Sequence, residues 1–211
     1  MRIAGIDEAG KGPVIGPLVV CGAVCDEHTA EMIKDLGVKD SKKLSPQMRK
    51  EVAKKLKEVV DYEVIILQPD ELDSEMEDKT INEILKECCA EIISKLNPDV
   101  VYLDSFDVKP ERLESELEGL TGKRIIAMHG GEREAIVAAA SVIAKTTRDE
   151  IVEKLKKKYG DFGSGYASDE RTRKWLEERL KEGEIPEIVR KKWKTVEKLR
   201  QGLKQRSLSE F

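Results

Sequence analysis

The chain has 211 residues, a formal net charge of −4, 38% charged residues and 4% aromatic residues. This length suits one domain with a small appendage rather than two domains. No apolar run approaches the length of a membrane span, and the N-terminus lacks the basic and then apolar pattern of a signal peptide. The four cysteines lack zinc-ligand spacing. We therefore expect a cytoplasmic protein with no membrane partner.

Strands and helices are expected to alternate along most of the chain. Runs rich in β-branched residues and bounded by turn residues predict strands, and apolar residues at helical spacing predict helices. The expected strands are 3–6, 14–24, 62–67, 100–103 and 124–128. The expected helices begin at 46, 81, 110 and 135, a loop or short helix covers 70–79, and further helices follow a glycine-rich loop at 160–168. This order indicates an α/β fold with a mixed five-stranded sheet flanked by helices, and a C-terminal helical extension.

Carboxylates follow three of the expected strands. Asp7 and Glu8 end the first, Asp104 ends the fourth, and Glu132 follows the fifth. Because open α/β sheets gather ligands at the carboxyl ends of their strands, these side chains are expected to converge. Oxygen ligands without Cys or His favour Mg²⁺ or Mn²⁺, and two such ions can hydrolyse a phosphodiester. The alternative is that Asp104 caps the loop before Pro110 and that Glu132 is solvated.

Two basic features suit a polyanion. Lys11 lies between Gly10 and Gly12, and flanking glycines let the backbone come close to a phosphate. Residues 189–206 carry eight Lys or Arg against one acid, which indicates either a solvated helix face or a surface that holds a polyanion.

Five blocks of the sequence share the pattern of one family. They are 7–13 (DEAGKGP), 40–44 (DSKKL), 102–104 (YLD), 139–145 (AASVIAK) and 163–166 (GSGY). In this order they resemble ribonuclease HII, most closely its archaeal form. The resemblance covers nearly the whole chain and implies a ribonuclease H-like fold. It also implies an endonuclease that cuts the RNA strand of RNA/DNA hybrids, and cuts at ribonucleotides embedded in duplex DNA. Two Mg²⁺ or Mn²⁺ ions would support this hydrolysis, which leaves a 5′-phosphate and a 3′-hydroxyl.

The resemblance implies catalytic and metal-binding roles for four acids. Asp7, Glu8 and Asp104 match the metal-binding acids of the family. Where the family has His-Lys-Ala-Asp with a proline soon after, this chain has His129-Gly130-Gly131-Glu132, no proline and one residue fewer before Val137. Glu132 is the aligned fourth acid, and Glu134 is the alternative. Because Glu is longer than Asp and the glycines loosen the loop, we expect reduced activity or an altered preference between Mg²⁺ and Mn²⁺.

The resemblance also implies substrate contacts. Gly10, Lys11 and Gly12 match a Gly-Arg-Gly segment that reads the RNA-to-DNA junction through the ribose 2′-hydroxyl and the adjacent phosphate. Lys replaces the usual Arg there, so a planar bidentate donor becomes a point charge. Tyr166 matches the tyrosine that packs on the sugar after the ribonucleotide and contacts its 2′-hydroxyl. Further phosphate contacts are expected from residues in matching segments, although the basic ones are as readily solvated: Lys42, Asn82, Lys145 and Arg148.

The end of the chain resembles a sliding-clamp-binding peptide that lacks its last aromatic residue. Gln205, Leu208 and Phe211 have the spacing of that motif, and Leu208 and Phe211 would enter an apolar pocket on the clamp. The alternative is an ordinary frayed tail. We therefore expect a monomer with a catalytic domain over 1–160, a substrate-binding helical extension over 161–204, and a tail over 205–211.

Two other functions compete with this interpretation. A hybrid-binding protein with an impaired metal site would keep Lys11, Tyr166 and the basic segment, and would lack a working fourth acid. A nuclease or integrase acting on DNA alone would share the fold, but the 10–12 segment and Tyr166 argue against it.

Overall fold

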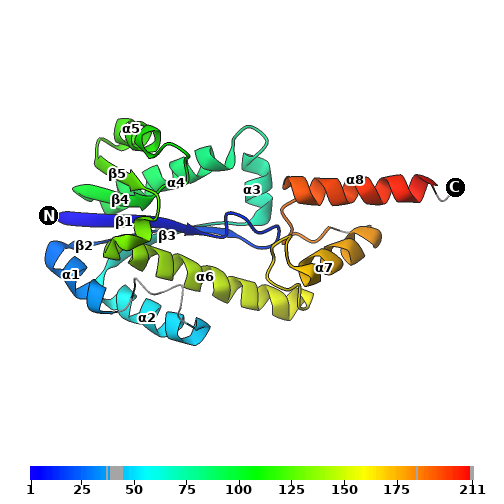
Figure 1. Ribbon diagram of the computed structural model, residues 1–211, viewed down its shortest axis with the longest axis horizontal. Coiled ribbons are helices and arrows are strands. Elements are labelled where there is room, and N and C mark those ends of the chain that lie inside the picture. Colours follow the sequence, from blue (N-terminus) through cyan, green and yellow to red (C-terminus); the bar gives the residue numbers. More distant parts are fainter. Residues whose placement is uncertain (37, 39–44, 184, 210–211) are drawn as a thin grey trace. The chain divides into compact units, whose positions relative to one another are not determined.

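The structure, a computed structural model, describes residues 1–36, 38, 45–183 and 185–209, with side chains as far as residue 202 (Figure 1). Lys42 therefore lies outside the described residues. The chain forms two compact units. The first comprises Met1–Ala9, Val19–Ile66 and Thr80–Arg148, and the second comprises Gly10–Leu18, Leu67–Lys79 and Asp149–Phe211. The domain boundaries expected at 160 and 204 stay predictions.

The first unit is built on one mixed sheet of five strands in the order β3-β2-β1-β4-β5. β1 (Arg2–Ala9) pairs antiparallel with β2 (Leu18–Asp26) and parallel with β4 (Val100–Asp104). β4 pairs parallel with β5 (Arg124–Met128), and β3 (Asp61–Leu67) lies at the other edge. The predicted α/β fold with a mixed five-stranded sheet is confirmed.

β1 is longer than the sequence predicts. Its pairing with β2 continues through Asp7, which lies opposite Cys21, and Glu8, which lies opposite Val20. The strand therefore continues past both acids to Ala9, because β2 still supplies backbone partners on one side. Both acids are held in extended backbone near the carboxyl end of β1.

β2 is shorter than predicted. It begins at Leu18 and not at Val14, because Gly16 adopts a φ of 85° and Pro17 lacks a backbone N–H for the ladder. Of the four residues before β2, Ile15 forms an isolated β-bridge to Val189, and both of these residues belong to the second unit.

Helices cover both faces of the sheet: α4 and α5 on one, and α1, α2 and the first part of α6 on the other (Figure 1). Helix starts follow capping chemistry, since Ser45 caps α2 and Thr80 forms a capping box with Glu83 at α4. The bounds are α1 Glu27–Asp35, α2 Pro46–Val59, α4 Ile81–Leu96, α5 Pro110–Thr121 and α6 Ala135–Tyr159. The sequence had not predicted α1.

α6 packs tightly on β1. A Cβ atom at Gly5 would lie 2.3 Å from the backbone carbon of Ile136, so only glycine permits this approach. The alanine-rich start of α6 is almost wholly buried, as its composition predicts. This contact brings the polar residues of α6 over the carboxyl end of β1.

The second unit contains α3 (Pro69–Glu75), the end of α6, α7 (Glu170–Lys181) and α8 (Lys194–Ser209). The predicted C-terminal helical extension is confirmed. Its core holds Phe162 and Trp175 edge to face, with ring centroids 5.8 Å apart. Among the described residues, no helix is long and apolar enough to cross a membrane.

Candidate active site

Asp7 and Asp104 lie side by side on neighbouring parallel strands. The last paired residues of β1 and β4 are Ile6 and Leu103, so the two acids are each the next residue along. Parallel strands are about 4.8 Å apart, and residues at matching positions face the same side. Asp7 and Asp104 therefore share the face that α6 covers. This is the convergence that the sequence predicted for these two residues.

Asp7 is buried from solvent and is held by polar groups of α6. Its side chain is buried, and burial raises its carboxyl pKa, with the charge of Asp104 acting in the same direction. A hydrogen bond from Ser141, the backbone N–H of Glu8 at 2.8 Å and the charge of Lys145 oppose that shift. Lys145 Nζ donates to Ser141 Oγ at 2.7 Å, which leaves the Ser141 hydroxyl to donate to Asp7. A carboxylate held at such a desolvation cost suits a cation partner.

Glu8 points away from this pair. Adjacent strand residues face opposite sides, so Glu8 faces the side that α4 covers. Burial raises the pKa of the Cys89 thiol on α4, and the charge of Glu8 adds more to this shift than the charge of Asp7 does. The structure therefore brings Asp7 and Asp104 together and places Glu8 on the other face of the same strand end.

The loop after β5 is tied to Asp104. The backbone N–H of Gly131 donates to Asp104 Oδ1 at 2.9 Å, and a Cβ at Gly131 would lie 2.8 Å from Asp104 Cα. Gly130 has a φ of 73°, and the short 3₁₀ helix η2 (Gly131–Arg133) follows it. These glycines bring the loop against β4, which corrects the expectation that they loosen it.

The two candidate fourth acids differ in exposure. Glu132 lies in η2 and is half-buried, whereas Glu134 ends η2 with an exposed side chain. Within the described residues, no three Asp, Glu, His or Cys side chains gather closely enough to hold one metal ion. The donor chemistry still fits a hard divalent cation, because buried Asp7 and half-buried Asp104 offer only oxygen atoms.

Three of the four expected phosphate contacts are described, and all lie in the first unit. Asn82 lines a cavity of about 500 Å³ whose wall also includes Lys86, Phe106 and Arg112. Lys145 is half-buried against Ser141. Arg148 is only 8% exposed, so the alternative that it is simply solvated is wrong.

The two glycine motifs of the second unit meet each other. A Cβ at Gly12 would lie 3.3 Å from the ring of Tyr166, which is 43% exposed. The carbonyl of Gly165 accepts the backbone N–H of Val14 at 2.8 Å. The 10–12 segment and Tyr166 are therefore brought together although they lie more than 150 residues apart in the chain.

Sequence reasoning missed two residues that support these groups. Ser141 looked like one more small residue in an apolar helix, and its contact with Asp7 becomes visible only once α6 is placed on β1. Arg190 belongs to the basic segment that was expected to be solvated or to hold a polyanion. That expectation is wrong for Arg190, which is fully buried and bonds the backbone of the 10–16 segment. Charge pattern alone does not separate it from its neighbours.

Comparison with known proteins agrees with this geometry. The family model for Ribonuclease HII matches residues 4–196. The Ribonuclease HII of Archaeoglobus fulgidus is 56% identical over 94% of this chain and 96% of its own length. That of Pyrococcus horikoshii is 45% identical over 99% of this chain and 97% of its own length.

Solved structures give the same result. A structure of the PCNA:RNase HII complex from Archaeoglobus fulgidus contains a chain that matches with a TM-score of 0.89 at 55% identity, over 94% of this chain and 96% of that one. The ribonuclease H2 of Pyrococcus horikoshii matches with a TM-score of 0.91 at 44% identity, over 97% and 99% of the two chains. With family-level similarity along nearly its whole length and the paired acids in register, the chain belongs to the ribonuclease HII family and is a ribonuclease H.

Proposed function

We propose that this ribonuclease is an endonuclease that cuts the RNA strand of RNA/DNA hybrids, and also cuts at single ribonucleotides in duplex DNA. The observation that supports it best is the pairing of buried Asp7 with half-buried Asp104, one residue beyond the register of two parallel strands. The products carry a 5′-phosphate and a 3′-hydroxyl.

The proposed cofactors are two divalent ions, Mg²⁺ or Mn²⁺. Asp7, Glu8, Asp104 and Glu132 are the residues that would hold them. When bound, such ions supply a nucleophilic water at neutral pH and stabilise the charge on the leaving oxygen. The protein's own contribution is positioning: Ser141 orients Asp7 and Gly131 orients Asp104.

Substrate recognition is assigned to the second unit and to the basic side chains of the first. In our proposal Gly10, Lys11 and Gly12 contact the ribonucleotide and its phosphate, and Tyr166 packs on the following sugar. The 2′-hydroxyl is the group that separates RNA from DNA at one nucleotide. The proposed phosphate contacts are Lys42, Asn82, Lys145 and Arg148.

A second candidate function is a hybrid-binding protein with an impaired metal site. The observation that favours it is the replacement of the usual fourth Asp by Glu132, together with the lack of a three-acid cluster among the described residues. Reduced activity, or an altered preference between Mg²⁺ and Mn²⁺, is the intermediate case.

One experiment separates these functions. Duplex DNA that contains one ribonucleotide is incubated with the protein, with and without Mg²⁺ or Mn²⁺. Metal-dependent cutting at the ribonucleotide supports the endonuclease, and retention of the duplex without cutting supports the binding protein. Cutting of an all-DNA duplex would identify a DNA nuclease.

Binding to a sliding clamp is proposed for the tail. The solved relative from Archaeoglobus fulgidus is a complex with PCNA. In this chain Gln205 and Leu208 belong to α8, and Phe211 lies outside the described residues. Deletion of 205–211 should weaken capture of the protein by an immobilised clamp, and unchanged capture would refute the assignment.

A further inference from the structure

Arg190 is a buried cation whose guanidinium donates hydrogen bonds to backbone carbonyls. Its side chain is 0% exposed. Nη2 donates to the Gly10 carbonyl at 2.7 Å, Nη1 donates to the Lys11 carbonyl at 3.3 Å, and Nε donates to the Gly16 carbonyl at 2.8 Å. A buried charge is costly unless it is well hydrogen-bonded, and two of these three bonds go to the segment that we assign to ribonucleotide recognition.

These bonds fix the direction of two backbone N–H groups. The Gly10 carbonyl and the Lys11 N–H belong to one planar peptide unit, and the Lys11 carbonyl and the Gly12 N–H belong to the next. All described peptide bonds are trans, so the N–H of each unit points away from its carbonyl. By holding the two carbonyls, Arg190 aims the N–H groups of Lys11 and Gly12 in the opposite direction.

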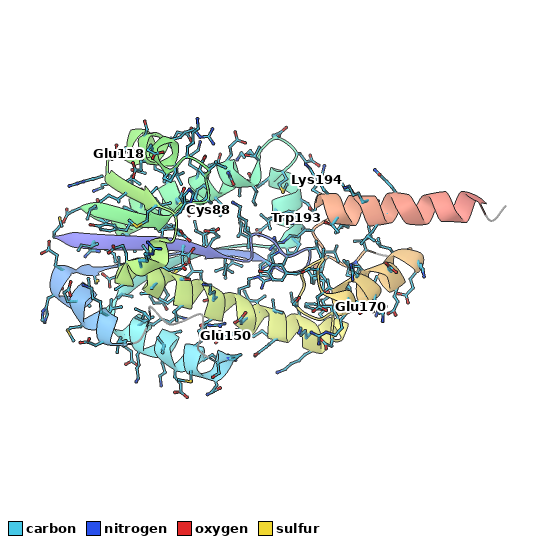
Figure 2. The ribbon with its side chains drawn as sticks, in the orientation of Figure 1. Cys88, Glu118, Glu150, Glu170, Trp193 and Lys194 are labelled. Atoms are coloured by element: carbon cyan, nitrogen blue, oxygen red, sulfur yellow. The ribbon has the colours of Figure 1, made fainter. Side chains whose placement is uncertain are left out.

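Arg190 is itself held from two sides. The ring of Trp193, the residue just before α8 (Figure 2), has its centroid 4.7 Å from the Arg190 guanidinium carbon, in a cation–π contact. Asp73 on α3 accepts the backbone N–H groups of Lys191 at 2.8 Å and Lys192 at 2.9 Å. The backbone that follows Arg190 is thus clamped, and the guanidinium is presented in one place.

We propose that Arg190 is a positioning residue for 2′-hydroxyl recognition, and that Asp73 supports it. The inference rests on the proposed role of Gly10, Lys11 and Gly12 as ribonucleotide readers. Arg190 acts through the peptide units of that segment and does not touch substrate. Its loss should remove the preference for a ribonucleotide while leaving general affinity for duplex.

The test is a ratio of dissociation constants measured in EDTA, where the metal-dependent reaction does not proceed. The two ligands are an all-DNA duplex and the same duplex with one ribonucleotide. We expect wild type to bind the ribonucleotide duplex about tenfold more tightly. Arg190→Met should bring the ratio close to one, and Arg190→Lys should restore part of it, since a point charge replaces a forked donor.

The matched control is Arg179→Met. Arg179 also stacks on a tryptophan, with its guanidinium carbon 5.6 Å from the Trp175 ring centroid, and it forms an ion pair with Glu182 at 2.7 Å. Its ratio should equal that of wild type. If Arg190 had only a structural role, its loss would lower the fraction of active protein and weaken the binding of both duplexes alike. The ratio of the two dissociation constants would then be unchanged.

The outcomes are distinct. A wild-type ratio of one would refute ribonucleotide recognition itself, and with it the proposed function. A wild-type preference that persists in Arg190→Met would overturn this inference alone. If Arg190→Met does not fold, Asp73→Ala is the second test, because Asp73 is half-buried and accepts hydrogen bonds from the backbone that directly follows Arg190. A reduced ratio in Asp73→Ala supports the inference, and a wild-type ratio overturns it.

Discussion

The backbone N–H of Gly131 donates a hydrogen bond to Asp104 Oδ1 across 2.9 Å. This bond joins the loop after β5 to the end of β4, and it fixes one oxygen of a proposed metal-binding acid. Because Gly131 is packed against the backbone of Asp104, side-chain size at position 131 controls this geometry.

Gly131→Ala should therefore damage both activity and stability. The new Cβ would meet Asp104 Cα at 2.8 Å, so η2 must move away. We expect a loss of about 1–3 kcal/mol in the free energy of unfolding, and a fall of about 10- to 100-fold in the rate of hybrid cleavage. Gly119→Ala on α5 is the control, since its Cβ would meet no atom within 4 Å. Equal activity in the two variants would show that the contact does not matter.

Glu132 and Glu134 can be separated by neutral variants. If Glu132 is the fourth acid, Glu132→Gln should lower the cleavage rate by about 100-fold or more, because a ligand charge is lost. The exposed Glu134 should tolerate Glu134→Gln with a change of less than about twofold. Rates in both Mg²⁺ and Mn²⁺ provide the measurement. The reverse pattern would assign the role to Glu134.

Asp7→Asn should lower the activity of the protein and raise its stability. Burial raises the pKa of Asp7, which means that keeping it charged costs folding free energy in the absence of metal. The neutral amide should raise the melting temperature in EDTA while lowering the cleavage rate by about 1,000-fold or more. Differential scanning calorimetry with and without Mg²⁺ checks this. A lower melting temperature in EDTA would show that Asp7 stabilises the fold instead.

Two buried threonines should respond in opposite directions to valine. Among the described residues, Thr146 Oγ1 is buried without a hydrogen-bond partner. Thr172 Oγ1 donates to the Phe162 carbonyl at 2.8 Å and accepts the Gly165 N–H at 3.1 Å. Thr146→Val should stabilise the protein by about 1 kcal/mol, and Thr172→Val should destabilise it by about 1–3 kcal/mol. Chemical denaturation of both variants measures the difference. The same sign in both would contradict this hydrogen-bond assignment.

The sequence predicted the strands, the helices and the meeting of Asp7 and Asp104 better than it predicted where the strands end and which residues hold the site in place. The apolar run before Asp7 predicts a strand from the sequence alone, but the extension of β1 through Glu8 depends on its continued pairing with β2. Asp7 and Asp104 were predicted to meet because parallel strands place their carboxyl ends at one edge. Such reasoning needs only the order of the elements.

Support residues escaped prediction because their role depends on tertiary contacts. Ser141 acts through the packing of α6 on Gly5, and nothing in its local sequence marks it. Arg190 carries the same charge as the other basic residues near it, yet it alone of those described is buried. Gly131 resembled a flexible loop residue, whereas close backbone approach to Asp104 is what requires it.

The central claim is that Asp7 and Asp104 jointly hold divalent metal. Titration of wild type, Asp104→Asn and the surface control Glu58→Gln on α2 with Mn²⁺, followed by the electron paramagnetic resonance signal of free Mn²⁺, tests it directly. Our account predicts that wild type and Glu58→Gln bind Mn²⁺ equally, and that Asp104→Asn binds it at least about tenfold more weakly. Equal Mn²⁺ affinity in all three proteins would contradict the account.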